Sequence, residues 1–195
     1  GYRHVPGNHC GSTALRNLLG FHGVEISEAM AFGLGAGAFF YYVVLDDHSP
    51  TRFTNGRAAR LEENFLELTD SPLRLRTDDD PNAGWALARE AVDEGHPALL
   101  LTDLYYLDHY GHSAHFPGHA VVLAGYDDEL AWLSDTAFED LQTTSLESLG
   151  EASLEAPGLA EGAQPVARGT LPNGAAGRAL FYGYLSRHRD ARANA

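Results

Sequence analysis

Cys10 is the only cysteine among 195 residues, and its position suits a reactive thiol. A polar turn at residues 7–9 precedes it, and an apolar pattern of helical period follows at residues 14–19. The N–H groups and partial positive charge of a helix N-terminus stabilise a thiolate and lower the pKa of a thiol. The spacing predicts a nucleophile at the first turn of a helix. The alternative is a small buried hydrophobic residue.

A histidine and an aspartate far along the chain could serve this thiol. His119 begins an apolar, β-branched run that ends at Gly125, and Asp135 follows a second short strand. A tight turn between two strands predicts antiparallel pairing, which makes His119 and Asp135 neighbours. Together with Cys10 they supply a nucleophile, a base for its proton and a carboxylate that fixes the tautomer of the base. The alternative is a histidine at a strand end and an aspartate in a turn.

Hydrophobic periodicity predicts an α+β protein. We expect helices at residues 12–21, 27–33, 58–68 and 83–93, and strands at residues 39–45, 73–77, 98–102, 119–126 and 131–134. After residue 149 the chain is rich in Gly, Ala, Pro and Glu until an apolar element at residues 179–185. We therefore predict a catalytic domain over residues 1–149. Residues 150–195 are expected to form a linker and a C-terminal extension, which could be a shortened second domain.

Several segments, taken in order, resemble one protein family. They are residues 9–19, 27–30, 32–37, 101–107, 115–127 and 135–138. Through them the chain resembles the butirosin biosynthesis protein H family of the papain-like superfamily, and more distantly the peptidase domain of bacteriocin exporters. The resemblance implies a papain-like cysteine protease fold, in which an N-terminal helix carrying Cys10 packs on an antiparallel sheet carrying His119 and Asp135. It assigns these residues the roles of nucleophile, base and acid, and orienting group.

The resemblance also implies a reaction, because the founding member of the family moves an acyl group from an acyl carrier protein to an aminoglycoside amine. We therefore expect a cysteine-dependent acyltransferase that forms a thioester on Cys10 and needs no cofactor. The expected partners are a small-molecule amine acceptor and an acyl carrier protein. The alternatives are a hydrolase of the peptidase or amidase type and a non-catalytic binding module on the same fold.

One position departs from the papain-like pattern. Those enzymes place a glutamine six residues before the cysteine to bind the oxyanion, and this chain has His4 there. His4, Asn8 and His9 are the candidates for the missing donor, beside the backbone N–H of Cys10. Removing one such donor costs about a hundredfold or more in rate. A site without it would therefore belong to a slow or repurposed enzyme.

An aromatic and acidic segment precedes the His119 strand. The candidates for substrate contact are Asp103, Tyr105, Tyr106, Asp108 and His115. The two carboxylates could receive a cationic amine, whereas the alternative for the tyrosines is a core ring with a hydrated hydroxyl. The four histidines between residues 109 and 119 could bind zinc by their number. We expect no metal site, because the glycines and proline among them break any helix that would align the rings.

The chain is acidic, with a net charge of −14, and all thirteen basic residues are arginine. Nucleic acid is not an expected partner, because phosphate binding needs clustered positive charge. The charge would attract a polycationic acceptor and repel an acidic carrier protein, although we interpret it first as solvation of the surface. No apolar run is long enough for a membrane span and no signal segment is seen, so we expect a cytoplasmic protein whose thiol stays reduced.

Overall fold

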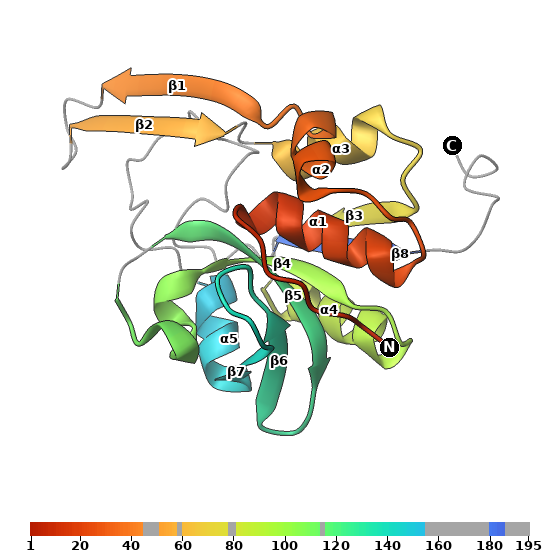
Figure 1. The fold of residues 1–195 in the computed structure, drawn as a ribbon. Helices are drawn as coiled ribbons and strands as arrows, with labels where there is room; N and C mark the ends of the chain where they lie inside the picture. The colour runs from red at the N-terminus through yellow and green to blue at the C-terminus, as the bar shows by residue number, and fades with distance from the viewer. Residues whose placement is uncertain (45–50, 58–59, 78–80, 114–115, 155–179, 186–195) are drawn as a thin grey trace.

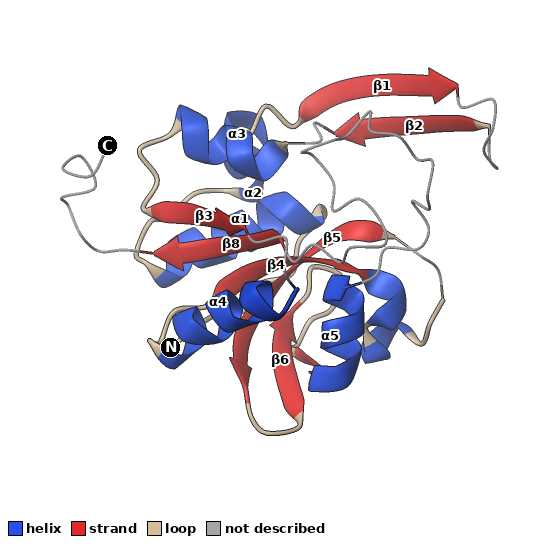
Figure 2. Ribbon diagram, turned by 180° about the vertical axis from the view of Figure 1, so that it is seen from behind, coloured by secondary structure: helices blue, strands red, loops and turns tan. Residues whose placement is uncertain are grey.

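The computed structural model describes the chain except residues 45–50, 58–59, 78–80, 114–115, 155–179 and 186–195. In the described part, helices cover both faces of an antiparallel sheet (Figure 1, Figure 2). The helices are α1 (Cys10–Phe21), α2 (Glu28–Leu34), α3 (Leu61–Leu68), α4 (Pro81–Asp93) and α5 (Leu146–Leu154), with 3₁₀ turns η1 (Leu104–Tyr106) and η2 (Asp108–Tyr110). None of these helices is long and apolar enough to cross a membrane.

The strands form two sheets. They are β1 (Ala38–Val44), β2 (Arg52–Arg57), β3 (Leu73–Thr77), β4 (Ala98–Asp103), β5 (Pro117–Tyr126), β6 (Leu130–Ser134), β7 (Gln142–Ser145) and β8 (Leu180–Leu185). The first two pair with each other, and Figure 1 shows them at the edge of the molecule beyond α2 and α3. The other six lie in the order β3-β8-β4-β5-β6-β7, with antiparallel neighbours throughout.

The central strands β4 and β5 are buried on both faces. Leu99 of β4 and Val122 of β5 belong to the core under α1, whereas Leu100 and Val121 belong to the core under α4 and α5. Successive side chains of a strand point to opposite faces, so helices on both faces require apolar residues at every position. This explains why both strands read as continuous apolar runs rather than as alternating patterns.

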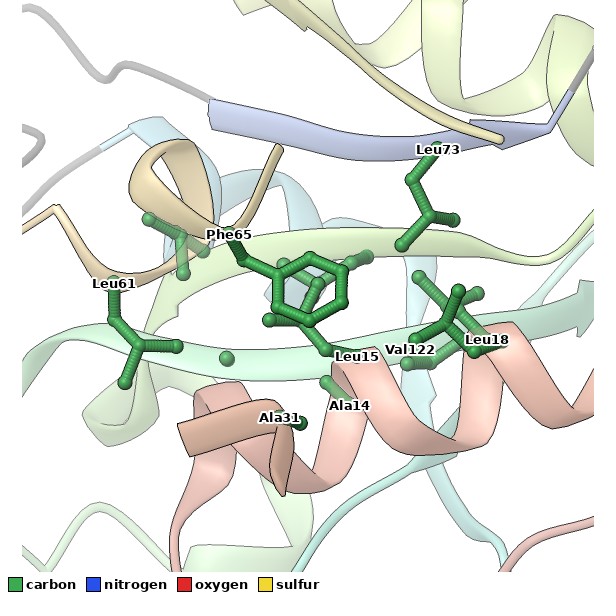
Figure 3. Close-up of a cluster of buried hydrophobic side chains, with 12 residues drawn as sticks. Ala14, Leu15, Leu18, Ala31, Leu61, Phe65, Leu73 and Val122 are labelled. Carbon is green, nitrogen blue, oxygen red and sulfur yellow. The ribbon is translucent and has the colours of Figure 1, made fainter. Parts of the chain in front are cut away.

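Helix α1 packs its apolar stripe on one face of the sheet. Figure 3 shows Leu15 and Leu18 of α1 in a cluster with Val122 of β5 and Phe65 of α3. Leu18 has no exposed surface and Leu15 has 1%. Because Cys10 is the first residue of this helix, the packing of α1 on β4 and β5 fixes the position of the thiol relative to those strands.

The segment ahead of α1 is bound along its length. The guanidinium of Arg16 and the side-chain amide of Asn17 both donate to the carbonyl of Val5. The backbone N–H of Gly7 donates to the carbonyl of Thr136, which follows β6, at 3.1 Å. The segment therefore joins α1 to the loop that carries Asp135.

The α+β fold is confirmed, and the structure adds strands β2 and β7, helix α5 and the turns η1 and η2, which the sequence analysis missed. Strands β2 and β7 have polar sequences without an alternating pattern, so they gave no periodic signal. Helix α5 crosses residue 149, where the catalytic domain was expected to end. Strand β8, from the apolar element at residues 179–185, lies between β3 and β4 in the central sheet. The division into a domain and an extension stays a prediction.

The packing of α1 can be tested by truncating a buried residue. We expect Leu18→Ala to lower the free energy of unfolding by about 2–5 kcal/mol, because it leaves a cavity between α1 and the sheet. The matched control Leu68→Ala removes a side chain that is 67% exposed and should change it by less than about 0.5 kcal/mol. Urea denaturation followed by circular dichroism measures both. Equal losses would contradict the described packing.

Candidate active site

Helix α1 begins at Cys10 and is capped by the residue before it. The Nδ1 atom of His9 accepts a hydrogen bond from the backbone N–H of Ser12 at 3.3 Å. Capping satisfies one of the N–H groups that a helix start leaves without an intrahelical partner. Cys10 is partly exposed, so a substrate can reach it, and its position at the first turn places it in the positive field of the helix.

Glu28 of α2 holds the turn ahead of the thiol. One carboxylate oxygen accepts from the backbone N–H groups of Asn8, at 3.0 Å, and His9, at 2.8 Å. Burial alone would raise the pKa of Glu28, but hydrogen bonds from these backbone groups and from the Asn8 side chain hold it below its ordinary value. An ionised carboxylate on α2 therefore fixes the backbone that presents Cys10.

His119 and Asp135 are hydrogen-bonded neighbours. The antiparallel register of β5 and β6 places Val122 opposite Ser134, and Asp135 is the next residue after β6. Nε2 of His119 lies 3.0 Å from Oδ2 of Asp135. Because an ionised carboxylate only accepts, the imidazole donates. The aspartate has no exposed surface and the histidine has 7%, so this contact is shielded from water.

The thiol of Cys10 hydrogen-bonds to the same imidazole. Since Nε2 of His119 faces Asp135, Nδ1 is the nitrogen left for the sulfur. Burial alone would lower the pKa of His119, but the hydrogen bonds to Asp135 and Cys10 and their negative charges outweigh it and raise the pKa to about 9. Burial would likewise raise the pKa of Asp135, yet hydrogen bonds from His109 and His119 bring it well below its usual range. The structure thus brings the three predicted catalytic residues together.

Two residues that the sequence analysis did not assign to the site also bind Asp135. Nε2 of His109 lies 3.0 Å from Oδ2, and the hydroxyl of Tyr110 donates to Oδ1 at 3.2 Å. Burial and the charge of Asp135 raise the pKa of Tyr110, which keeps its hydroxyl protonated as a donor. No spacing pattern in the sequence predicts these contacts, because they form where η2 meets the end of β6. His109 had entered the sequence argument only as one of four histidines that could bind zinc.

His4, at the position of the papain-like glutamine, is bound to the loop around Asp135. Its Nε2 donates to the carbonyl of Phe138 at 2.8 Å, because a carbonyl can only accept. Nδ1 lies 2.7 Å from the hydroxyl oxygen of Ser134. Both ring nitrogens of His4 are therefore engaged by this loop rather than by an oxyanion, and the contacts brace the chain on both sides of Asp135.

The other two oxyanion candidates lie beside Cys10. Asn8 is exposed, and its side-chain amide gives one of two N–H groups to Glu28 at 3.3 Å. His9 uses Nδ1 to cap α1, and its ring meets the edge of Phe32 at a centroid distance of 5.2 Å. In the described part of the chain, Asn8 therefore keeps a second side-chain N–H group beside the one that it gives to Glu28.

The two acidic substrate candidates hold backbone groups. Asp103 is 1% exposed, and its Oδ1 accepts from the backbone N–H groups of Tyr105, at 3.0 Å, and Phe116, at 2.9 Å. Oδ2 of Asp108 accepts from the backbone N–H of Ser145, just before α5, at 2.7 Å. Both carboxylates are therefore engaged by backbone N–H groups of the chain itself.

The remaining substrate candidates are aromatic. Tyr105 and Tyr106 are partly buried and pack edge to face at a centroid distance of 5.1 Å. Nδ1 of His112 donates to the carbonyl of Tyr105 at 2.9 Å, because a carbonyl only accepts. His115 lies outside the described residues. Among the residues that are described, no group of three or more histidine, cysteine or acidic side chains is placed to hold a metal ion.

Comparison with known proteins identifies the family and the fold of the chain. Residues 9–136 match the family described as butirosin biosynthesis protein H, N-terminal. The fold is similar to a C39-like peptidase from Bacillus anthracis, with 13% identity, 96% of each chain covered and a TM-score of 0.58. It is also similar to the peptidase domain of Streptococcus ComA, a bi-functional ABC transporter involved in quorum sensing, with 15% identity and a TM-score of 0.51, over 94% of this chain and 98% of that one. No curated protein matches the chain.

The contacts of Glu28 make stability depend on pH. The pKa of Glu28 is lower in the folded chain than its ordinary value of 4.5, so its contribution is present above about pH 4.5 and is lost as pH falls below that value. We expect Glu28→Gln to lower the free energy of unfolding at pH 7 by about 1–3 kcal/mol, and the difference from wild type to shrink in acid. Urea denaturation between pH 3 and pH 7 measures it.

The matched control for this measurement is Glu67→Gln. Glu67 pairs with Arg60 at 2.9 Å on the surface, where an ion pair contributes little. We expect its substitution to leave the unfolding free energy almost unchanged at every pH. A loss of stability in Glu28→Gln that did not vary with pH would contradict the role given to the Glu28 charge.

The contact between the thiol and the imidazole predicts the reactivity of Cys10. In wild type, iodoacetamide should label Cys10 rapidly at pH 7, because His119 carries a proton there and stabilises the thiolate. His119→Gln should move the midpoint of labelling upward, towards the free-thiol value of about 8.5. Cys10→Ala is the control for labelling elsewhere. Identical pH profiles in wild type and His119→Gln would refute the pairing.

Proposed function

The chain belongs to the butirosin biosynthesis protein H, N-terminal family, and from that premise we propose that it is an acyltransferase that works through a thioester on Cys10. The observation that supports this most directly is the hydrogen-bonded series of Cys10, His119 and Asp135. The series provides a nucleophile, a group that takes and returns its proton, and a buried carboxylate that orients that group.

At pH 7 the proposed reaction starts with the proton of Cys10 on Nδ1 of His119, as a thiolate paired with an imidazolium. The sulfur then attacks the carbonyl carbon of an acyl thioester and forms a tetrahedral intermediate. When the bond to the donor sulfur breaks, His119 returns the proton to the leaving thiolate. The products are a free donor thiol and an acyl group held on Cys10.

In the second half, an amine attacks the acyl carbonyl on Cys10. His119 accepts a proton from the amine nitrogen, and collapse of the second tetrahedral intermediate releases an amide and the Cys10 thiolate. Asp135 stabilises the imidazolium of His119 in both halves, because its buried charge lies 3.0 Å from Nε2. The same chemistry with water in place of the amine gives hydrolysis.

The oxyanion of each intermediate would form at the N-terminus of α1. The backbone N–H of Cys10 and the positive end of the helix dipole are the first stabilising groups there. We propose the side-chain amide of Asn8 as the second donor, because Glu28 receives only one of its two N–H groups and His4 is bound to Phe138 and Ser134.

The acceptor proposed is a small cationic amine. Its attraction to the site rests on the overall charge of −14 rather than on Asp103 or Asp108, which hold backbone groups. Tyr105 and Tyr106 stay as the proposed aromatic contacts. An acyl carrier protein as donor would meet the same negative charge, so we propose that local arginines reduce the repulsion where it docks.

A hydrolase is the second candidate, and one observation favours it. Both structures of similar fold are described as peptidases, although at 13% and 15% identity the likeness concerns the fold alone. A third candidate, a binding module without catalysis, draws its support from His4 in place of the usual glutamine. The hydrogen bond between Cys10 and His119 argues against it, because a binding module needs no activated thiol.

The experiment that separates these candidates is detection of the acyl-enzyme. We expect incubation with a panel of acyl thioesters to add one acyl group to wild type and none to Cys10→Ala, as measured by intact mass. Small polyamines should then release the acyl group faster than buffer does, with an amide as product. Release as free acid at the same rate with and without amine would identify a hydrolase. No adduct with any donor would favour the binding module.

A further inference from the structure

We propose that His109 is a positioning residue of this site, which shares the carboxylate of Asp135 with His119 and holds it toward that imidazole. Nε2 of His109 and Nε2 of His119 each lie 3.0 Å from the same oxygen, Oδ2. All three side chains are more than nine-tenths buried. The chemical consequence rests on the proposed function, but the contact itself does not.

The two contacts determine where the protons lie. An ionised carboxylate oxygen has two lone pairs and no proton, so both imidazoles must donate from Nε2. In its neutral form His109 then carries no proton on Nδ1. That atom is buried and has no hydrogen-bond partner in the described part of the chain. The structure thus assigns His109 a single polar task, which is to donate to Asp135.

The surroundings of His109 suit a fixed ring. Its imidazole lies 4.8 Å from the ring of Tyr110 and 5.2 Å from that of Phe138, between centroids. The titratable groups around it are Asp135 after β6, His119 on β5 and Tyr110 on η2, with Cys10 of α1 reached through His119. These two rings, which also contact each other at a centroid distance of 5.4 Å, limit the rotation of the imidazole and keep Nε2 on the carboxylate.

An orienting carboxylate has to be held by something other than the group that it orients. Without His109, the donors to Asp135 among the described residues would be His119 at Oδ2 and Tyr110 at Oδ1. The carboxylate could then rotate about its Cβ–Cγ bond and follow the imidazole. With His109 in place, a residue of η2 fixes the position of Oδ2, and the imidazole of His119 has to align with that oxygen.

Removal of the donor should therefore weaken the pairing of Cys10 with His119. We expect His109→Leu, which keeps an apolar side chain of similar reach, to move the midpoint of iodoacetamide labelling upward. Its labelling rate at pH 7 should fall at least about tenfold, the effect of losing one hydrogen bond to a charged group. His109→Gln keeps an N–H and should restore most of the rate. If His109 only filled space in the core, the amide of His109→Gln would not restore the labelling rate.

The control is His112→Asn, which alters an exposed histidine that binds the Tyr105 carbonyl at 2.9 Å and has φ of 55°. Asparagine tolerates that conformation, and the labelling profile should stay that of wild type. A wild-type midpoint in His109→Leu, or equal impairment in His109→Gln and His109→Leu, would overturn the proposal.

A second measurement uses the wild-type protein and does not depend on whether His109→Leu folds. Long-range nitrogen–proton NMR spectra should show His109 as the Nε2–H tautomer, with a proton that exchanges slowly with solvent. An Nδ1–H tautomer would overturn the proposal. Neither experiment needs an acyl donor. A result that contradicts the role of His109 is therefore distinct from a result that contradicts the proposed function. Normal labelling without any acyl-enzyme would refute only the function.

Discussion

The arrangement of the site depends on the negative charge of Asp135, which has no contact with solvent. A buried carboxylate is tolerated only where hydrogen-bond donors surround it, because desolvation of an unpaired charge is costly. Here the donors come from His119 on β5 and from His109 and Tyr110 on η2. The requirement to satisfy one aspartate therefore brings a strand and a 3₁₀ turn together beside Cys10. It also favours the protonated form of His119, whose pKa rises to about 9 despite burial.

The carboxylate and the thiol are positioned by different elements of the fold, since Asp135 follows β6 and Cys10 begins α1. Residues such as Leu15 and Leu18 pack helix α1 on β4 and β5. This packing fixes the position of Cys10 relative to the sheet. Pairing of β5 with β6 determines where Asp135 stands relative to His119. The N-terminal segment joins the two, since Gly7 binds the carbonyl of Thr136 while Val5 binds the side chains of α1. Core packing and strand register thus set the geometry of the site before any contact with a substrate.

Much of this was accessible from the sequence, and the reasons for the gaps are physical. Periodicity identified α1, β4, β5 and β6, because these elements bury apolar residues and the pattern of burial is written in the residue types. The family resemblance and the papain-like fold are confirmed. Polar strands such as β7 carry no such signal. The roles of His109, Tyr110 and Glu28 depend on which turn meets which strand end, and no spacing along the chain encodes that. Burial of Asp103 was equally hidden, since an aspartate beside tyrosines reads as exposed.

The substitution at residue 4 shows how one change can affect two parts of a site. A glutamine there would offer an amide N–H to an oxyanion, whereas His4 connects Ser134 to the carbonyl of Phe138 and so encloses the loop of Asp135. His4 is thereby committed to holding the loop of Asp135, and in the proposed reaction charge stabilisation would fall to the start of α1 and to Asn8. Glu28 becomes important for the same reason, because it fixes the backbone of residues 8 and 9 from which those donors point. In the proposed reaction the segment ahead of α1 would therefore serve both tasks, with His4 positioning Asp135 and Asn8 stabilising the oxyanion beside Cys10.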